Sequence, residues 1–453
     1  MKKATAGRRL ALDILLGAES EGGKADVLIR NALNRNFDMD DRDRAFVSRL
    51  TRGCIEKRIF LDYAADQFAS KKTAKMKPVI RNVIRMGIYQ MLFMDSVPDA
   101  TACNEAVLLA EERGFKGLTG FVNGVLRNVS RNRDIKLPDK EDVLNYLSIK
   151  YAMPKELCAL FEERFGRKRA ERLLAAYDTE RPLSVRFILG DEGAECIAVE
   201  NWKAAAVDAV HNPYLEHMYF LRNVPGVELL QGYDEGLFMV ADTSSALAAI
   251  CAGVKKGDRV IDLCAAPGGK SMILAAAAGC EGRVLAYDVS EDKKALIEEN
   301  ARRLGMENIS AGVHDATVFD KELEGSADVV MADLPCSGMG VMGRKCDIRH
   351  NIDTGKISEL AALQRRILSN AVRYLKSGGT LLFSTCTVSR QENEDNADWL
   401  IKEEGMLPDS LGGFLPDSLK EYETEEGRVQ LLCGEPAGLP LIDSFFISRF
   451  KKP

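Results

Sequence analysis

The sequence predicts an α/β protein whose C-terminal part holds a parallel sheet covered by helices on both faces. From Gly236 onward, strand-like and helix-like segments alternate, which is the pattern of consecutive βαβ units. From Arg8 to Arg131, apolar residues recur at helical spacing without a convincing alternating strand, which predicts an all-helical domain. Residues 145–235 mix helical stretches with short strand-like runs, so we expect a small α+β subdomain between the two.

Length and composition agree with several domains. The chain has 453 residues, and at roughly 100 to 200 residues per domain this predicts two to four domains. Hydrophobic residues make up 46% and charged residues 29%, with 14 Pro, a composition that rules out disorder as the main state. Segment 131–142 is charged, contains a Pro and lacks an apolar period, so it reads as a linker. We therefore predict domains at 1–138, 145–235 and 236–453.

Targeting and cysteine patterns limit the class of protein. The apolar stretch near the start is interrupted by Arg8, Arg9 and Asp13, which argues against a signal peptide. No uncharged apolar run approaches the roughly 18 residues needed to cross a bilayer, so we expect a cytoplasmic protein with no membrane partner, and a monomer. The eleven Cys form no CxxC pair and no cluster with the four His, which favours neither a disulfide framework nor a metal site.

Charge is divided unevenly along the chain. Residues 1–140 hold 26 Lys+Arg and 18 Asp+Glu, net +8, although the whole chain is net -6. A basic domain on an acidic body is typical of a nucleic-acid-binding appendage, because Lys and Arg displace counterions from phosphates. The alternative is a set of solvated helix faces. The candidate phosphate track within the domain consists of Lys71, Lys72, Lys75, Lys77, Arg81 and Arg85.

The two later regions have a definite expected order of elements. In the subdomain, helical residues 145–166 and 168–178 precede strand-like residues 183–189, 218–223 and 226–230. In the C-terminal region we expect parallel strands at 259–264, 283–289, 309–316, 327–335 and 378–386, helices at 271–278, 293–305 and 360–375, and a late antiparallel edge strand at 444–452.

The segment RVIDLCAAPGGKS (259–271) joins a buried strand to a helix through a turn of small residues. Ligands of open α/β sheets bind at such strand ends. The small residues admit a ligand close to the backbone, and the helix start offers free N–H groups to a carboxylate or phosphate. The segment is not GxGxxG, and a tight turn without a ligand is the alternative.

Two acidic residues end the following strands. Asp288 ends the second strand and Asp315 the third, where carboxylates can accept hydrogen bonds from ribose hydroxyls or from an adenine amine. Either residue alone could instead be a helix N-cap. Together with the glycine turn, the pair predicts a cofactor that carries a nucleoside.

Two thiols are expected at the same edge of the sheet. ADVVMADLPCSG (327–338) ends a fourth strand with Asp333 and Cys336, and GGTLLFSTC (378–386) ends a fifth with Cys386. Most cytosolic Cys are small core residues, as Cys251, Cys264 and Cys280 could be. Cys336 and Cys386 differ by position, because strand ends are where chemistry occurs in this architecture.

These motifs resemble a known family. DLCAAPGGKS, DLPCSG and STCTV are similar to the signatures of the two-cysteine RNA (cytosine-C5)-methyltransferases, and RAFVSRLTRGCIEKR, IYQMLFMD and GFVNGVLRN are similar to the NusB-like RNA-binding domain. The pairing resembles the RsmB/NOP family, in its bacterial Sun/Fmu-type branch that methylates 16S ribosomal RNA, over nearly the whole chain. The resemblance implies a Rossmann-like methyltransferase sheet, with S-adenosylmethionine as cofactor and ribosomal RNA as partner.

The resemblance also implies roles for single residues. The turn around the methionine part of the cofactor would be Cys264, Ala265, Ala266, Pro267, Gly268, Gly269 and Lys270. Asp288 would bind the ribose, Asp315 would lie near the adenine, and Asp333 would lie between cofactor and target base. Cys386 would be the nucleophile and Cys336 would help to release the product.

The chain departs from the family pattern at a few positions that carry no catalytic group. Leu334 stands where Ala is usual, Cys346 where Pro is usual and Ala241 where Gln is usual, and the family usually has Asn soon after Arg186. These departures bear on the shape of the base pocket and on RNA contacts.

Two other functions fit parts of the pattern. The same chemistry on transfer RNA agrees with the catalytic motifs, since only the helical domain favours ribosomal RNA. An RNA-binding assembly or antitermination protein would use the helical domain alone, but it would need neither thiol. Because RNA specificity usually targets unpaired bases, we expect a loop cytosine splayed into the site.

Overall fold

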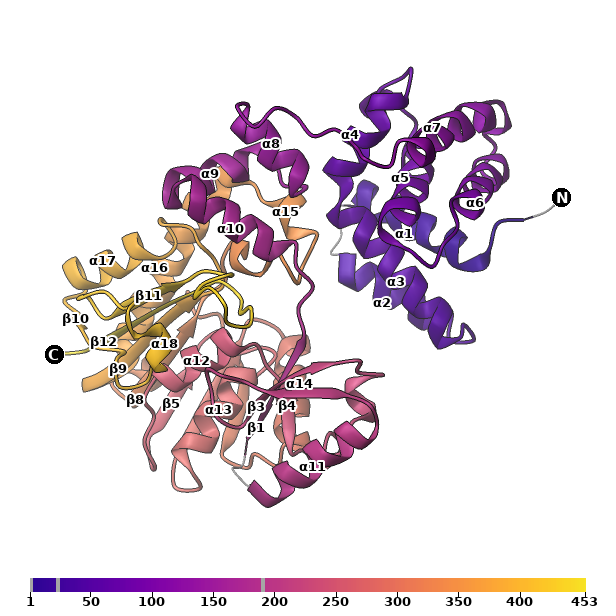
Figure 1. The fold of residues 1–453 in the computed structure, drawn as a ribbon. Coiled ribbons are helices and arrows are strands. Elements are labelled where there is room, and N and C mark those ends of the chain that lie inside the picture. The colour runs from indigo at the N-terminus through magenta and orange to yellow at the C-terminus, as the bar shows by residue number, and fades with distance from the viewer. Residues whose placement is uncertain (1–2, 22–24, 189–191) are drawn as a thin grey trace. The chain divides into compact units, whose positions relative to one another are not determined.

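The computed structural model describes residues 3–21, 25–188 and 192–453 (Figure 1). The described part of the chain divides into two compact units. One extends to Asp178 and also contains Arg344–Ile352; the other contains Thr179–Gly343 and Asp353–Pro453. This division differs from the predicted boundaries, because the helices at 143–177 group with the N-terminal helices rather than with the strands that follow them.

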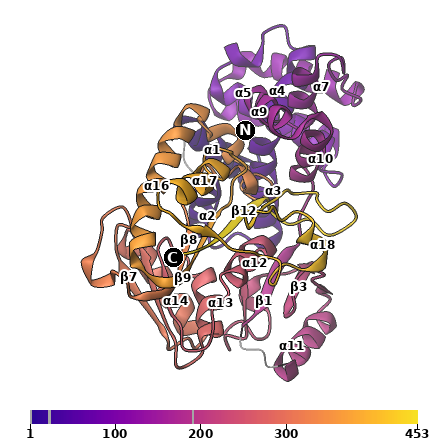
Figure 2. The same cartoon turned by 90° about the vertical axis from the view of Figure 1, so that its left-hand side faces the viewer.

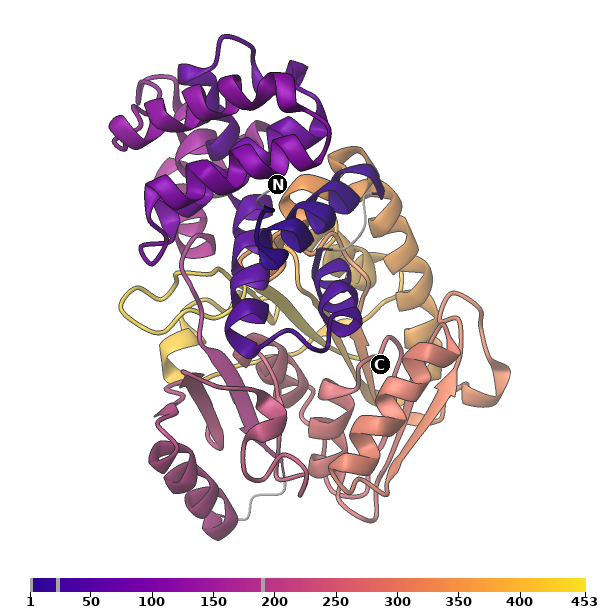
Figure 3. The ribbon, with the colours of Figure 1, turned by 90° about the vertical axis from the view of Figure 1, so that its right-hand side faces the viewer.

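The first unit is helical throughout its described residues (Figures 1 and 3). Its elements are α1 (Ala6–Glu21), α2 (Ala25–Arg35), α3 (Asp41–Glu56), α4 (Arg58–Phe68), η1 (Thr73–Lys75), α5 (Pro78–Phe93), α6 (Asp99–Glu112), η2 (Lys116–Leu118), α7 (Thr119–Arg131), α8 (Val143–Lys150), α9 (Lys155–Phe165), α10 (Arg167–Tyr177) and α15 (Ile348–Asn351). Helix α10 is tied to the earlier helices by an ion pair between Lys57 and Asp178.

Helix α5 forms the centre of this unit. It is buried without interruption from Asn82 to Met91, and it packs against α1, α3, α4, α6 and α7. A helix that is buried over all of its faces has to lie inside a bundle. Gly87 allows the approach of α7, since a Cβ there would lie 2.7 Å from Leu126 Cδ1.

The second unit begins with a small antiparallel sheet in the order β2–β3–β1–β4. Its elements are β1 (Leu183–Phe187), α11 (Glu192–Ala204), β2 (Asp208–His211), β3 (Met218–Arg222), η3 (Val227–Leu229) and β4 (Phe238–Val240). Trp202 of α11 stacks on Phe187 and meets Phe238 edge-on, with ring centroids 5.5 and 5.0 Å apart. These aromatic rings form the core of the small sheet.

The sequence prediction for this region needs two corrections. Residues 226–230, predicted as a strand, contain the 3-10 helix η3 instead. Glu228 and Leu229, two consecutive residues, are both exposed, so the run lacks the alternation of covered and exposed side chains that a strand would show. Helix α11 was not predicted, and residue 189 of the first predicted strand lies outside the described residues.

The second unit continues as a larger sheet in the order β10–β12–β9–β8–β5–β6–β7, with β11 paired to β12. Its strands are β5 (Arg259–Asp262), β6 (Arg283–Asp288), β7 (Ile309–Val313), β8 (Ala327–Asp333), β9 (Leu375–Thr385), β10 (Leu407–Pro408), β11 (Arg428–Leu431) and β12 (Phe445–Lys451). Strands β5 to β9 pair in parallel and β12 runs antiparallel to β9. The predicted α/β fold with a late antiparallel strand is confirmed.

Helices cover both faces of this sheet (Figures 1 and 2). They are α12 (Thr243–Cys251), α13 (Gly269–Ala278), α14 (Glu291–Arg303), η4 (Lys321–Leu323), η5 (Met339–Val341), η6 (Thr354–Lys356), α16 (Ile357–Tyr374), α17 (Glu394–Lys402) and α18 (Asp417–Lys420). On β5, Val260 joins the core with α12, α13 and α14, whereas Ile261 joins the core with α16 and α17. Consecutive strand residues thus serve opposite faces, which explains why these strands are apolar throughout.

Within the described residues, no helix combines the length and apolarity that crossing a membrane requires.

Candidate active site

The carboxyl ends of the parallel strands surround a cavity of about 190 Å³. Strand β5 lies between β6 and β8, so the order of the strands reverses there, and such switch points are the usual ligand sites of open α/β sheets. The lining residues come from the end of β4 and the start of α12, from the β5–α13 turn and from the end of β8: Met239, Val240, Ala241, Asp242, Ser245, Ala246, Asp262, Cys264, Ala265, Ala266, Pro267, Gly269, Lys270, Ile273 and Asp333.

The β5–α13 turn presents backbone to this cavity, as the sequence predicts. Gly268 precedes α13 with φ +101°, a left-handed conformation that favours glycine. Around Gly269 the space is open, because the nearest atom to a Cβ there would be Met239 Cε at 3.9 Å. The first N–H groups of α13 have no partner within the helix, so they are available to an anionic ligand group.

The two strand-end acids behave differently. Asp288 is buried and accepts hydrogen bonds from the backbone N–H of Ala266 at 3.0 Å and from Lys293 Nζ at 2.8 Å, so it braces the turn. Asp315 is exposed and caps its own turn by accepting from the N–H and hydroxyl of Thr317. These hydrogen bonds lower the pKa of Asp315. Neither acid lines the cavity.

Asp262 was missed from the sequence, although it ends β5 in the RVIDLC motif. It is buried, and its Oδ2 accepts from Ser271 Oγ at 2.6 Å. Its Oδ1 has no hydrogen-bond partner among the described residues. Burial raises the pKa of Asp262 to about 6. A buried acceptor without a partner beside a cavity is costly in the free protein, and a ligand that carries a donor group would satisfy it.

The two predicted thiols do meet. Cys336 follows β8 and Cys386 follows β9, and their Sγ atoms lie 3.4 Å apart. The pKa of the Cys336 thiol is raised well above its usual range by its hydrogen bond with Cys386, by burial and by the negative charge of Glu392. Cys336 is therefore held as a neutral thiol.

Asp333 lies at the end of β8 and is held on both of its oxygens. Lys270 Nζ lies 2.6 Å from Oδ2, and Ser384 Oγ donates to Oδ1 at 2.9 Å. Burial alone would lower the pKa of Lys270, but Asp333 and other neighbouring negative groups raise it, so Lys270 is an ammonium ion. Lys270, assigned from sequence to the cofactor turn, thus links that turn to Asp333.

A second residue missed from the sequence, Glu392, holds the two cysteine loops. Its side chain is fully buried, with Oε1 accepting from the Ser337 N–H at 2.8 Å and Oε2 accepting from Ser337 Oγ at 2.6 Å. Ser337 Oγ also lies 2.7 Å from Thr387 Oγ1, and Gln364 Nε2 donates to Oε1 at 3.2 Å. The residues that follow the two cysteines are therefore fixed to one carboxylate. The sequence signal was the acidic run QENE soon after STCTV.

The predicted phosphate track is only partly exposed. Lys71, Lys72, Lys75 and Lys77 are exposed and precede α5. Arg81 is paired with Glu19 at 2.8 Å. The prediction needs correction at Arg85, which is 5% exposed and paired with Asp62 at 2.6 Å and with Glu19 at 3.1 Å. Its guanidinium neutralises acids inside the helical unit, because a buried charge has to be paired, and it is not available to a phosphate.

The described residues contain no group of three or more His, Cys, Asp or Glu side chains that could hold a metal ion.

The unpartnered oxygen of Asp262 leads to a prediction about pH. Because the folded-state pKa is raised above the unfolded value of about 3.9, ionised Asp262 destabilises the fold, from near pH 4 upward and to its full extent above about pH 6. We expect Asp262→Asn to raise the free energy of unfolding at pH 7.5 by up to about 3 kcal/mol, and therefore to raise Tm. The gain should shrink to nothing near pH 4. Thermal unfolding across pH 4 to 8, with exposed Asp292→Asn as control, checks this. An equal gain at every pH would contradict it.

Glu392 leads to a second prediction. Glu392→Ala leaves the Ser337 N–H and Gln364 without their acceptor, so we expect a loss of about 1 to 3 kcal/mol of stability. Losing the negative charge near Cys336 should also lower the pKa of that thiol and speed its alkylation by iodoacetamide, followed at Cys336 and Cys386 by peptide mass spectrometry. Glu392→Gln should retain part of the stability, and exposed Glu403→Ala serves as control. Unchanged alkylation of Cys336 in Glu392→Ala would contradict the role of this charge.

Comparisons with known proteins give the family. A family model described as 16S rRNA methyltransferase RsmB/F matches residues 249–450, and a NusB family model matches residues 5–131. A probable ribosomal RNA small subunit methyltransferase B of Bacillus subtilis (strain 168) is 32% identical over 99% of both chains. A ribosomal RNA small subunit methyltransferase B of Escherichia coli O7:K1 is 28% identical over 78% of this chain and 81% of its own.

Solved structures show the same fold. The crystal structure of a protein named PH0851 matches with a TM-score of 0.77 at 21% identity, covering all of both chains. The structure of NSun6 from Pyrococcus horikoshii with SFG matches with a TM-score of 0.57 at 20% identity, covering 66% of this chain and 98% of its own. The chain therefore belongs to the RsmB/F family of 16S ribosomal RNA methyltransferases, and its cofactor is S-adenosylmethionine.

Proposed function

We propose that this protein transfers a methyl group from S-adenosylmethionine to C5 of a specific cytosine in 16S ribosomal RNA, through a covalent bond between Cys386 and C6 of the base. The observation that carries the proposal is the meeting of two thiols, 3.4 Å apart, beside the Asp333–Lys270 ion pair. Cytosine C5 is too weak a nucleophile to take a methyl group unaided, and addition of a thiolate at C6 makes it enamine-like.

The attacking thiolate is Cys386. The raised pKa of Cys336 disfavours that residue as the attacking thiolate. The Cys336 S–H then donates a hydrogen bond to the Cys386 thiolate. The resemblance of STC to the family nucleophile leads to the same assignment.

Asp333 and Lys270 supply the proton that the base needs. As the bond between Cys386 Sγ and C6 forms, electron density moves toward N3, which has to gain a proton. The proton comes from the Lys270 ammonium, whose Nζ lies 2.6 Å from Asp333 Oδ2: it passes to Asp333 as Asp333 passes a proton on to N3, which leaves Lys270 as the neutral amine and Asp333 unchanged. The ion pair thus serves as a short proton relay.

The cofactor would occupy the cavity at the strand ends. When bound, S-adenosylmethionine supplies the electrophilic methyl group. The turn from Cys264 to Lys270 would hold its methionine part in the cavity, and its ribose and adenine would extend beyond the cavity lining to Asp288 and Asp315. The open backbone at Gly269, the unpartnered Oδ1 of Asp262 and the free N–H groups of α13 support this fit, since the methionine part carries both a carboxylate and an ammonium group.

Cys336 assists release of the product. After methyl transfer the proton on C5 has to leave before the bond between Cys386 and C6 can break with its electron pair returning to sulfur. Once Cys386 is bonded to carbon, its charge no longer raises the pKa of Cys336. The Cys336 thiol can then lose its proton to water and accept the proton from C5.

The helical unit would hold the ribosomal RNA. Lys71, Lys72, Lys75 and Lys77 give exposed positive charge before α5, which suits contact with phosphates. We further propose that the enzyme acts as a cytoplasmic monomer.

Variants of the two cysteines test the chemistry. Cys386→Ala should abolish methylation and the covalent adduct with RNA. Cys336→Ala should still add to the base and transfer the methyl group, but elimination should stall, leaving protein crosslinked to methylated RNA on denaturing gels. Buried Cys251→Ala, far from the strand ends in sequence, is the matched control. An adduct in Cys386→Ala and none in Cys336→Ala would reverse the two roles.

Mapping of 5-methylcytosine tests the substrate. RNA from cells with the gene should carry a 5-methylcytosine in 16S ribosomal RNA that is missing from cells without it. The wild-type gene should restore this mark, and the Cys386→Ala gene should not. If 5-methylcytosine in transfer RNA, rather than in 16S ribosomal RNA, depends on the gene, the substrate is transfer RNA and this part of the proposal is wrong.

A further inference from the structure

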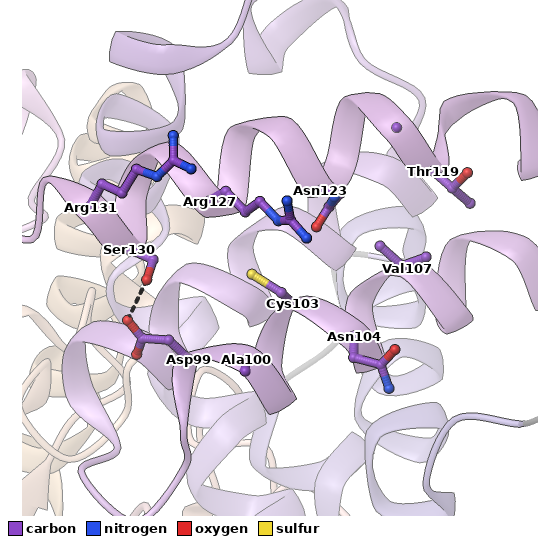
Figure 4. Close-up of a pocket in the computed structure, with 11 residues that line it drawn as sticks. Asp99, Ala100, Cys103, Asn104, Val107, Thr119, Asn123, Arg127, Ser130 and Arg131 are labelled. Atoms are coloured by element: carbon purple, nitrogen blue, oxygen red, sulfur yellow. Dashed lines mark hydrogen bonds between the residues drawn. The ribbon is translucent and has the colours of Figure 1, made fainter.

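A polar groove runs between α6 and α7 of the helical unit (Figure 4). Its volume is about 660 Å³, within the range of ligand sites. The lining residues are Asp99, Ala100, Cys103, Asn104, Val107, Thr119, Gly120, Asn123, Arg127, Ser130 and Arg131. None of them belongs to the phosphate track predicted from the sequence, and the site at the strand ends is in the other unit.

The groove exists because the two helices turn polar or small side chains toward it. Helix α7 buries Val122, Val125, Leu126 and Val129 in the core, so its opposite face carries Asn123, Arg127 and Arg131 at helical spacing. At Gly120, the start of that face, a Cβ would meet no other atom within 4 Å. Helix α6 contributes the small Ala100 and the exposed Asn104.

The charge of the groove is positive. Arg127 and Arg131 are exposed, and neither forms an ion pair with a described residue. The acid in the lining, Asp99, already accepts from Ser130 Oγ at 2.7 Å and lies 3.6 Å from Arg133 Nη1. Figure 4 shows Asp99 turned toward Ser130, at the end of the groove where Arg131 lies. Two guanidinium groups are therefore left to attract an anion.

The other lining groups indicate which anion fits. The carboxamides of Asn104 and Asn123 can both donate and accept, which suits base edges and ribose hydroxyls, whereas a guanidinium fork matches a phosphate. Val107 is the largest apolar side chain of the lining, so the groove lacks the apolar anchor that protein interfaces usually have. The chemistry matches a single strand, whose bases are free to turn toward the carboxamides.

We propose that the α6–α7 groove binds a single-stranded segment of the RNA substrate, with Arg127 and Arg131 on its phosphates and Asn104 and Asn123 on its bases or ribose hydroxyls. The proposal rests on the proposed function, because it takes the ribosomal RNA as the ligand. It adds a second RNA-contacting surface, distinct in its residues from the four lysines before α5.

The test measures binding of a labelled single-stranded RNA dodecamer of mixed sequence to the full-length protein at 50 to 300 mM salt. Each phosphate contact contributes about 0.7 to the slope of log affinity against log salt for single strands. Arg127→Ala/Arg131→Ala should thus reduce the slope by about 1.4 and weaken binding by about tenfold, as expected for lost charge-assisted contacts. The matched control is Arg52→Ala, whose exposed guanidinium is already paired with Asp26 at 2.9 Å.

Two further measurements keep the result decisive. Asn104→Asp/Asn123→Asp preserves size and adds negative charge, so it should also weaken RNA binding, and circular dichroism shows whether each variant folds. Photocrosslinking of the wild-type protein to 4-thiouridine RNA should label peptides of α6 or α7. Unchanged slope and affinity in the arginine variant, or no crosslink in either helix, would overturn the proposal and leave the groove to a protein partner.

Failure of the groove proposal and failure of the proposed function give different results. Binding of an oligonucleotide requires no methyl transfer. An arginine variant that binds RNA like the wild type overturns the groove even if 16S ribosomal RNA is methylated. A wild-type protein that methylates no cytosine but loses RNA affinity on substitution of the two arginines overturns the chemistry and supports the groove.

Discussion

The register between β8 and β9 is the constraint on which the reactive edge depends. The two strands pair in parallel with Asp333 opposite Ser384, and Leu334 N–H donates to Ser384 O at 3.0 Å just beyond the last pair. Cys336 and Cys386 follow these ends by a few residues, so their sulfurs meet. A slip of one residue would turn Asp333 to the opposite face of the sheet. The ion pair with Lys270 and the meeting of the thiols would both be lost.

Beyond the ends of β8 and β9, the two loops that follow are held together by hydrogen bonds outside the strand pairing. Gly340 N–H donates to Cys386 O at 2.9 Å, and Ser444 N–H donates to Gly340 O at 3.1 Å. A Cβ at Gly340 would lie 2.7 Å from Cys386 O, so only glycine fits between these loops. Glu392 also holds these loops, through its hydrogen bonds with Ser337. Its hydrogen-bond partners among the described residues include no cation, so its burial is costly, and its negative charge contributes to the raised pKa of Cys336.

The sequence predicts the parts of this site that depend on period and position. Strand alternation places the GGK turn, Asp333, Cys336 and Cys386 at one edge, because the carboxyl ends of parallel strands share an edge. Asp262 and Glu392 were not predicted, since their importance comes from burial without a neutralising partner, a property of packing that no spacing reveals. Arg85 was misjudged for the same reason. A basic residue within a basic run looks solvent-exposed until its helix is found at the centre of the bundle.

Residues 344–352 belong to the helical unit, which the sequence alone does not predict. They follow the Cys336 loop directly, yet they pack within the helical unit. Arg349 is 1% exposed and lies 3.5 Å from Glu56. His350 Nε2 donates to Ile55 O at 2.8 Å, which places its proton on Nε2, and burial lowers the pKa of His350 to about 3. Because the hydrogen bond of His350 and the ion pair of Arg349 are both made inside that unit, the segment cannot leave it without breaking them and leaving a charge without its partner.

The chain therefore passes from one unit to the other at three places: after Asp178, after Gly343 and after Ile352. The first is an ordinary linker, but the second lies only seven residues after Cys336 and three after Gly340, whose N–H bonds Cys386 O. The unit proposed to hold RNA is thus covalently joined to the loop proposed to do the chemistry. The connecting segment also carries Cys346, which stands where the family usually has Pro and is buried within the helical unit.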